Sequence, residues 1–543
     1  MGGAGGQDIA MATGTANPQV FTAQAVAAMS PQHVARLLQS KAATIATLEH
    51  QLDWFRRQLF GKKSERFAPE PDPQQMHLGQ WLGDACVLPV PPEQPAGSTV
   101  PAHTRRKPSR DFADDSRDAP FFDATVVPVQ TIEVPNPEAQ GLAPEQYEVV
   151  GQKVSHRLAQ RPGSFVVLKY VRPVIKRHDT QTLHCAPAPL GVIEGSRADV
   201  SFVAGLLVDK FRYHLPLYRQ HQRLLDAGFT LSRPWLTQLV QQGSQLLEPV
   251  FDAQLASICS GHVIAMDEVP VKAGQAGNGK MKATYFWPVY GDQDEVCFPH
   301  FESRRHEHVQ QALGAQLAPG TVLLSDGYGA YDAYAKRTGI TNAQCWAHSR
   351  RGIFEAKDVE PQAAGQALEQ IAALHKVEEQ IRQRKLTGEA KRLHRSMHSK
   401  PLVDKFFDWV DKQFERQGLL PSNPLTKALA YVHERRAGLR VFLDDPAVAI
   451  DTNHIERALR PIPTGRKNWL FCWTEVGAKH AGIVQSLIAT CRLHGIDPYT
   501  YLVDVLQRVG QHPAARVAEL TPRRWKAMFA DNPLLSDLHR STC

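Results

Sequence analysis

The sequence predicts a multidomain protein that is mainly α-helical and contains one α/β core. Its 543 residues are too many for a single hydrophobic core, which points to several domains. Two short apolar runs, Val263–Met266 and Thr321–Ser325, are typical of buried strands, and each is followed at once by an aspartate, Asp267 or Asp326. Residues 355–448 carry long helical patterns instead. We therefore expect an α/β core with acids at its strand ends, interrupted by an all-helical insertion.

The composition restricts where the protein works and what it binds. The net charge is +7, from 62 Lys and Arg against 55 Asp and Glu, which allows a polyanionic partner without requiring one. The eight cysteines are scattered with no Cys-x-x-Cys pair, which argues against a disulfide framework or a standard zinc finger and favours a reducing cytoplasm. The sequence shows neither an export signal nor a run of about 18 apolar residues. We expect a cytoplasmic protein with no membrane partner.

The first 66 residues divide into a leader and a heptad repeat. Residues 1–30 are rich in Gly, Ala, Thr and Gln and are expected to be disordered. In residues 31–66, apolar residues recur every seven positions, which is typical of a coiled coil or leucine zipper and predicts a homodimer. A single amphipathic helix packed on its own domain is the alternative. The repeating residues are Leu38, Ile45, Leu52 and Leu59.

Residues 67–140 are proline-rich and predict a linker. Within them, Arg105, Arg106 and Lys107 begin a basic run that suits contact with DNA phosphates. A solvated charge run has the same pattern.

Two small segments separate this linker from the core. Residues 141–195 alternate apolar and polar side chains and predict a small β-rich module, in which His178, His184 and Cys185 do not make a four-ligand zinc site. Residues 196–255 are helical, with one helix from Leu215, a turn at Gly228 and a second helix after Ser232. This is the outline of a DNA-reading helix-turn-helix and, equally, of an ordinary α-hairpin.

The order of elements in residues 256–354 predicts the type of core. After the Asp267 strand come two strand-like runs, 282–290 and 295–301, followed by a helix, the Asp326 strand, a second helix and a last strand. The order β-β-β-α-β-α-β is that of the ribonuclease H-like fold. Strands one and four are neighbours in that fold, so we expect the two aspartates side by side.

Two carboxylates at neighbouring strand ends predict a metal site. They repel each other unless a cation binds, and Mg²⁺ (or Mn²⁺) prefers oxygen ligands of this kind. Two such ions, about 3.5–4 Å apart, can activate the attacking oxygen and stabilise the leaving oxygen in phosphoryl transfer. The site needs a third acid on a helix beyond the insertion. Residues 449–492 complete the core and offer Glu456 on a short helix ended by Pro461, where the plainer interpretation is a salt bridge to Arg460. Residues 493–543 form a C-terminal helical region.

Seven short motifs, spread in order over nearly the whole chain, carry a resemblance to a known family. They are Gln58-Leu-Phe-Gly-Lys-Lys-Ser-Glu65, His214-Leu-Pro-Leu-Tyr-Arg-Gln220, Asp267-Glu-Val-Pro270, Ser325-Asp-Gly-Tyr-Gly-Ala-Tyr331, Cys345-Trp-Ala-His-Ser-Arg-Arg351, Asn453-His-Ile-Glu-Arg-Ala-Leu-Arg-Pro461 and Gly465-Arg-Lys-Asn-Trp-Leu-Phe471. Together they resemble the insertion sequence 66 family of DDE transposases. The resemblance implies that Asp267, Asp326 and Glu456 are a DDE triad that binds divalent metal for strand cleavage and strand transfer at transposon ends.

One segment departs from the family pattern. Members usually carry a Cys-x-x-Cys zinc-binding module ahead of the motif at His214, whereas residues 141–195 lack those cysteines. No structural zinc is therefore predicted. The resemblance implies double-stranded DNA as partner, at the transposon ends and at the target, with accessory proteins of the same element. It also implies association with the bacterial nucleoid.

Basic and aromatic residues near the acids each have two interpretations. Four basic residues can clamp DNA phosphates or can simply be solvated or helix-capping. Trp346 and Trp469 can stack on a displaced base or belong to the core, and His348 supports either the acids or only the fold. The four basic residues are Arg350, Arg351, Arg466 and Lys467.

Two other functions remain open at this stage. One is a nuclease of the same fold that cuts without strand transfer. The other is a DNA-binding regulator with a silent catalytic centre, and the presence of all three acids weighs against it.

Overall fold

The computed structural model of the protein describes residues 121–539, apart from positions 141, 162, 276, 278–279, 416–421, 467 and 471, together with scattered residues between 30 and 45. The chain divides into two compact units, residues 1–63 and 64–543. In the first unit, Leu38 and Ile45 are helical and exposed.

Several predicted features lie outside the described residues. They are Leu52, Leu59, most of the linker 67–140, the basic run at Arg105, Arg106 and Lys107, and Lys467. The coiled coil and the basic linker therefore stay predictions.

A long antiparallel hairpin begins the described part of the second unit. Its strands are β2 (Tyr147–Arg161) and β3 (Ser164–Arg177), which pair along nearly their whole length. Two shorter strands, β1 (Val129–Glu133) and β4 (Leu183–Cys185), pair with successive parts of β3. β2, β3 and β4 lie within the predicted β-rich module 141–195, whereas β1 lies before it, among residues predicted to be linker.

Three helices lead from this sheet into the core. They are α3 (Val200–Phe211), α4 (Leu217–Asp226) and α5 (Arg233–Cys259). The turn between α4 and α5 contains Gly228 at a φ of 86°, a left-handed conformation that favours glycine. The Ser232 side chain caps α5 by accepting a hydrogen bond from the Trp235 backbone N–H. The predicted helix, glycine turn and helix are confirmed.

The core of this unit is a five-stranded sheet in the order β12-β11-β5-β8-β9. Its strands are β5 (Val263–Met266), β8 (Val289–Gly291), β9 (Val296–Cys297), β11 (Val322–Ser325) and β12 (Thr341–Gln344). β5, β11 and β12 run parallel, whereas β8 is antiparallel to β5 and β9 is antiparallel to β8. β5 and β11, which lead into Asp267 and Asp326, are direct neighbours, as the sequence predicts.

The predicted single strands at 282–290 and 295–301 are wrong, because each run divides between two sheets. The first becomes β7 (Met281–Phe286) and β8, and the second becomes β9 and β10 (His300–Phe301). With β6 (Val269–Gln275), β7 and β10 form a separate three-stranded sheet. Pro288 and Pro299 stand at the two divisions. A proline cannot donate to a strand ladder, so it ends pairing on one sheet and lets the chain cross to the other.

Two short helices flank β11 in the chain. α6 (Glu307–Leu313) is shorter than the predicted helix over 306–317, because Gly314 ends it at a φ of 89°. α7 (Gly329–Thr338) follows the Asp326 turn and packs on β11 and β12.

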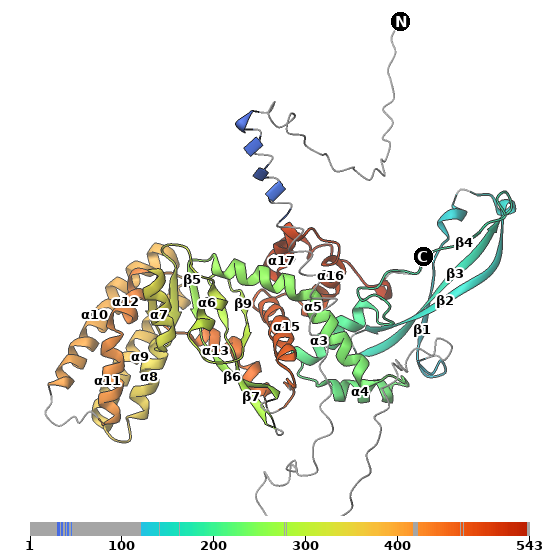
Figure 1. Ribbon diagram of the computed structural model, residues 1–543. Coiled ribbons are helices and arrows are strands. Elements are labelled where there is room, and N and C mark those ends of the chain that lie inside the picture. Colours follow the sequence, from blue (N-terminus) through green and yellow to red (C-terminus); the bar gives the residue numbers. More distant parts are fainter. Residues whose placement is uncertain are drawn as a thin grey trace, which may run out of the picture. The chain divides into compact units, whose positions relative to one another are not determined.

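Residues 355–448, where the sequence predicts an insertion, are mainly helical and lie beside the β12 edge of the sheet (Figure 1). α8 (Trp346–Glu355) leads into this insertion, whose own helices, coloured yellow to orange, are α9 (Pro361–Gln383), α10 (Gly388–Phe414), α11 (Pro424–Glu434) and α12 (Arg436–Asp444). The buried Trp346 anchors them, since its ring packs 5.3 Å from that of Phe406 and its indole N–H donates to the Leu439 carbonyl.

The chain returns to the sheet and ends in a further set of helices. These are α13 (Asn453–Leu459), α14 (Pro461–Gly465), α15 (Glu475–Leu493), α16 (Pro498–Arg508) and α17 (Pro522–Met528). The predicted start at Asp497 and Pro498 is confirmed, because the Asp497 side chain caps α16. α15 packs on α5 and on β9, at the sheet edge opposite the insertion (Figure 1). None of the described helices is long and apolar enough to cross a membrane.

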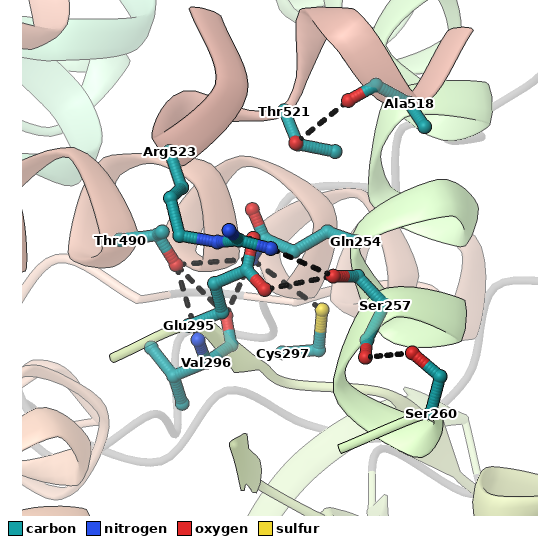
Figure 2. A network of polar contacts seen from close by, with 10 residues as sticks. All are labelled: Gln254, Ser257, Ser260, Glu295, Val296, Cys297, Thr490, Ala518, Thr521 and Arg523. Carbon is teal, nitrogen blue, oxygen red and sulfur yellow. Dashed lines mark hydrogen bonds and ion pairs between the residues drawn. The ribbon is translucent and has the colours of Figure 1, made fainter. Parts of the chain in front are cut away.

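A buried polar network joins these C-terminal helices to the core (Figure 2). Glu295, only 1% exposed, lies with Oε1 3.3 Å from Nε of Arg523 on α17. Its Oε2 accepts a hydrogen bond of 2.9 Å from the Ser257 hydroxyl on α5. Nearby, the Gln254 amide donates to the Val296 carbonyl and to Thr490 Oγ1, at 2.9 Å each. The charge of Glu295 is therefore met by a cation and a hydroxyl from two other elements.

Candidate active site

The two aspartates project from the ends of neighbouring strands. Asp267 follows β5, and its Oδ1 accepts a hydrogen bond of 2.8 Å from the Glu268 backbone N–H. Asp326 follows β11, and its Oδ1 accepts one of 2.9 Å from the Tyr328 backbone N–H. A Cβ added at Gly327 would collide with the side chains of Tyr431 and Arg435, so glycine is required where the insertion approaches this turn. In the part of the chain that the structure describes, neither aspartate forms an ion pair with a basic side chain.

Glu456 reaches the same region because the end of the insertion is tied to the end of β12. The Trp346 backbone N–H donates to the Ile450 carbonyl at 3.1 Å, and the Thr452 N–H donates to the Cys345 sulfur at 3.3 Å. α13 therefore starts beside the C-terminal end of the sheet, with Thr452 as its N-cap residue. Glu456 lies in the first turn of this helix.

The predicted salt bridge between Glu456 and Arg460 is not formed. Glu456 Oε1 lies 3.7 Å from Nη2 of Arg351 instead. Both side chains are well exposed, at 38% and 61%, so this contact contributes little to stability. Its consequence is positional, because it holds the Glu456 carboxylate towards α8.

The three acids influence one another electrostatically. Burial raises the pKa of Asp267 from 3.8 to about 7, and the carboxylates of Glu268, Asp326 and Glu456 add to the rise, while the hydrogen bond from the Glu268 N–H opposes it. A raised carboxylate pKa among other carboxylates indicates a site where a bound cation would relieve the repulsion between their charges. Asp267, Asp326 and Glu456 thus form one electrostatic cluster.

Glu268 is a fourth acid at the site, and the sequence reasoning missed its role. Its Oε2 accepts a hydrogen bond of 2.6 Å from the buried Tyr331 hydroxyl, and its Oε1 contacts the Arg304 guanidinium. Burial, with the nearby Asp326 charge, raises the pKa of Glu268. The sequence places Glu268 directly after Asp267, which could have drawn attention to it. Only the fold shows that Tyr331 and Arg304 contact its carboxylate.

The other predicted residues lie at different distances from the cluster. His348 is near Asp326 and Glu456, burial lowers its pKa, and its Nδ1 is buried with no hydrogen-bond partner among the described residues. Arg350 is exposed and points to a cavity beside α9. The guanidinium of Arg466 donates to the Pro270 carbonyl at 2.7 Å.

The core interpretation of the two tryptophans is confirmed. Trp346 is fully buried among the helices of the insertion. Trp469 is 2% exposed and stacks on the His214 ring, with centroids 4.6 Å apart. Neither offers a free face to a displaced base.

The residues fit a hard divalent cation by their chemistry, although they are not arranged as ligands. In the described part of the chain, no three His, Cys, Asp or Glu side chains form a group that could hold a metal ion, and Glu456 is turned towards Arg351. The donors are nevertheless carboxylate oxygens, which Mg²⁺ and Mn²⁺ prefer. Asp267 has other carboxylates, and no basic side chain, among the causes of its raised pKa.

Comparisons with known proteins identify the family of the chain. A family model described as "Transposase IS66 family" matches residues 195–480, which include all three acids. A second, "IS66 C-terminal element", matches residues 486–523, and a third, "Transposase C of IS166 homeodomain", matches residues 47–115.

Similar relatives occur in Sinorhizobium fredii (strain NBRC 101917 / NGR234). Uncharacterized protein y4hP is 30% identical over 517 residues, covering 91% of each chain. Uncharacterized protein y4jD is 27% identical over 519 residues, covering 92% of this chain and 97% of its own. Since the first family model spans more than half of the sequence, the chain belongs to the IS66 family of transposases.

Proposed function

We propose that this protein is a DNA transposase that cleaves and transfers strands at the ends of an insertion sequence, using a DDE triad and two divalent metal ions. The observation that carries the proposal is the acid cluster at the end of β5, where burial and three nearby carboxylates raise the pKa of Asp267 to about 7. A structural role would be served better by a paired carboxylate.

The strand order supports a ribonuclease H-like core for this chemistry. The first three strands of the five-stranded sheet are antiparallel, the fourth pairs with the first, and the fifth pairs with the fourth. The helical insertion α9–α12 then separates the fifth strand from α13, which carries Glu456. This is the arrangement in which two strand-end aspartates and one helical glutamate can face the same phosphate.

In this proposal Asp267, Asp326 and Glu456 would hold Mg²⁺ or Mn²⁺. The bound ions would activate a water or a 3′-hydroxyl and stabilise the leaving oxygen. The residues of the chain have separate tasks. Asp267 must release its proton to become a ligand, so the raised pKa makes metal affinity depend on pH. Tyr331 and Arg304 hold Glu268, and thereby the backbone at Asp267, in place.

DNA binding follows from the same family membership. The "Transposase C of IS166 homeodomain" match covers the basic run at 105–107, and the α4–α5 pair offers a second candidate contact. We propose double-stranded DNA at transposon ends and target as the partner, a homodimer through residues 31–66, and accessory proteins of the same element. Such work would take place at the bacterial nucleoid, in the cytoplasm.

The test uses the purified full chain, Mg²⁺ or Mn²⁺, and a labelled duplex with the terminal repeat that flanks the coding region. Strand-transfer products support the proposal. Hydrolysis alone indicates a nuclease, and binding without cleavage indicates a regulator. Asp326→Asn should abolish both products, whereas Asp408→Asn, which changes an exposed carboxylate on α10, should leave them unchanged. Equal cleavage by Asp326→Asn and the parent would show that the triad is assigned wrongly.

A further inference from the structure

A cavity of about 510 Å³ lies between the helical insertion and the start of the Glu456 helix. Its size is within the range of pockets that hold small ligands. The walls come from α8, α9 and the first residue of α13. The lining residues are Ala347, Arg350, Ala372, His375, Lys376, Glu379 and Asn453.

The charges around this cavity, which we call the α8–α9 cavity, favour an anion. Arg350 on α8 and Lys376 on α9 line the cavity, and both are exposed. Neither side chain forms a hydrogen bond or ion pair with another described residue. The single acid of the lining, Glu379, is already engaged along its own helix by Arg382 and by the Gln383 amide. Two alanines leave space between the cationic groups.

A second cavity of similar size shows that this charge pattern is not general to the insertion. It measures about 480 Å³ and is lined by Asp411, Glu434, His433 and two apolar residues. Its lining holds two acids and no Lys or Arg, and Arg436 from outside the lining pairs with Asp411 at 2.9 Å. The two cavities therefore differ in the sign of the ligand they would accept.

The α8–α9 cavity adjoins the acid cluster. Arg350 is next in the chain to Arg351, which contacts Glu456. Asn453 lies three residues before Glu456, on the same side of α13. Asp451 ties the walls together, because it accepts hydrogen bonds from Asn453 and lies 3.9 Å from Nδ1 of His375 on α9. A strand whose phosphate is cut at the acids would place a neighbouring phosphate close to this cavity.

We propose that the α8–α9 cavity binds one backbone phosphate of the DNA strand that enters the active site, with Arg350 and Lys376 as its charged contacts. The inference rests on the proposed transposase function and extends it, because it gives the helical insertion a direct part in holding DNA. The two neighbouring arginines then have different partners: Arg351 contacts Glu456, and Arg350 contacts the bound strand.

The experiment measures binding to the terminal-repeat duplex by fluorescence anisotropy without divalent metal, over a series of salt concentrations. The Arg350→Ala/Lys376→Ala variant should bind about tenfold more weakly than the parent, since each charge-assisted contact is strong. For this variant, the slope of log affinity against log salt concentration should be less steep by the amount expected for about one phosphate contact. The control, Arg384→Ala/Lys405→Ala, removes the same charges from exposed positions of the insertion outside the cavity.

A scan with single methylphosphonates, which lack the phosphate charge, locates the contact. One position near the cleavage site should weaken binding by the parent and by the control, but not by Arg350→Ala/Lys376→Ala. Equal affinity of the two double variants, or no such position, would overturn the proposal. Inorganic phosphate at constant ionic strength separates the two sources of phosphate. Competition with the duplex that is lost in the variant supports the DNA backbone as the ligand, whereas phosphate that binds the parent without changing its affinity for the duplex overturns the proposal in favour of a free anion.

These readouts need no catalysis, so they stand apart from the proposed function. If the parent binds with the expected positional pattern but never cleaves, the transposase chemistry fails and the cavity assignment survives. If the parent cleaves and transfers strands while the scan shows no position specific to Arg350 and Lys376, only the cavity assignment fails. Thermal unfolding of the variant should match that of the control, because both pairs of side chains are exposed.

Discussion

Two carboxylates at the central sheet, the buried Glu295 and the partly exposed Asp267, have opposite surroundings. Glu295, just before β9, meets Arg523 at 3.3 Å and the Ser257 hydroxyl at 2.9 Å (Figure 2). Asp267, just after β5, meets the carboxylates of Glu268, Asp326 and Glu456. The same sheet therefore contains one acid whose charge is matched and one whose charge is opposed. The matched acid can stabilise the fold, whereas the opposed acid costs stability unless something else binds.

The matched pair also links two separately recognised parts of the chain. Glu295 lies within the segment 195–480 and Arg523 within the segment 486–523. Their contact fastens the C-terminal helices to the core. The opposed cluster, in contrast, lies wholly within the first segment. We expect substitutions in the two regions to separate stability from activity.

Asp267→Asn should have the largest effect, a loss of activity without a loss of stability at pH 7. Losing one metal ligand removes several kcal/mol of transition-state stabilisation, so cleavage should fall about a thousandfold, or about 4 kcal/mol. The free energy of unfolding at pH 7 without metal should not fall, since the amide is already neutral. Cleavage assays and urea unfolding would measure the two quantities. A variant that keeps cleavage but loses stability would reverse the comparison.

Glu295→Gln should act on stability alone. It leaves the Arg523 cation beside a neutral group, and breaking a buried pair costs about 3–5 kcal/mol. Arg523 is 32% exposed, so we expect a loss of about 2–4 kcal/mol in urea unfolding. Cleavage per folded molecule should not change. Adding Arg523→Met to Glu295→Gln should restore part of the loss, and no recovery in this double-mutant cycle would mean that the two side chains do not interact.

The stability of the metal-free protein should fall as the pH rises, because of Asp267. Its pKa is about 7 in the folded chain against an ordinary value of 3.8. The unfolded chain therefore releases this proton first, and the contribution, complete below about pH 4, is lost as the pH rises through 7. One pKa unit corresponds to about 1.4 kcal/mol; since Asp267 is partly exposed, we expect about 2 kcal/mol.

Urea unfolding in EDTA between pH 4.5 and 8, compared with Asp267→Asn, would measure this slope. Mg²⁺ should restore the stability of the parent at pH 8 but not that of the variant, because a bound ion favours the ionised ligand. A constant difference between the two proteins across this range would contradict the pKa of Asp267.

The smallest effect should come from Tyr331→Phe. The change removes the hydroxyl that donates to Glu268 Oε2 at 2.6 Å and leaves the contact with Arg304. A lost hydrogen bond to a charged group costs about 1–2 kcal/mol. Tyr334 lies on the same helix as Tyr331, and its hydroxyl donates a hydrogen bond of 3.0 Å to the uncharged Gly314 carbonyl. Tyr334→Phe should therefore cost less stability than Tyr331→Phe. Equal losses in urea unfolding would show that Glu268 does not depend on Tyr331.

The sequence predicts the local features of the site better than its long-range contacts. The runs before Asp267 and Asp326 are short, mainly apolar and bounded by turn residues, so their identity as buried strands follows from pattern alone. The division of the following runs at Pro288 and Pro299 was missed. A proline inside an apolar run has a local meaning, but the second sheet that takes over the chain is visible only in three dimensions.

The assignment of Glu456 shows more clearly what the local sequence pattern cannot predict. Nothing in the local pattern of α13 distinguishes it from an exposed glutamate, and only the family resemblance selects it. Its contact with Arg351 joins residues far apart in the chain, as do the pairing of Glu295 with Arg523 and the two walls of the α8–α9 cavity. Such contacts depend on how helices pack, and hydrophobic periodicity gives a helix face without naming its partner.

The junction of the helical insertion has a consequence for how the chain can vary. The backbones of Trp346, where the chain leaves the sheet, and Ile450, where it returns, are joined by a hydrogen bond of 3.1 Å. The residues between them therefore form a loop whose two ends are held together at the sheet. The entropy of closing a loop grows only with the logarithm of its length. Lengthening or shortening the outer helices should therefore leave the spacing of the acids intact, provided that the side chains covering Trp346 remain.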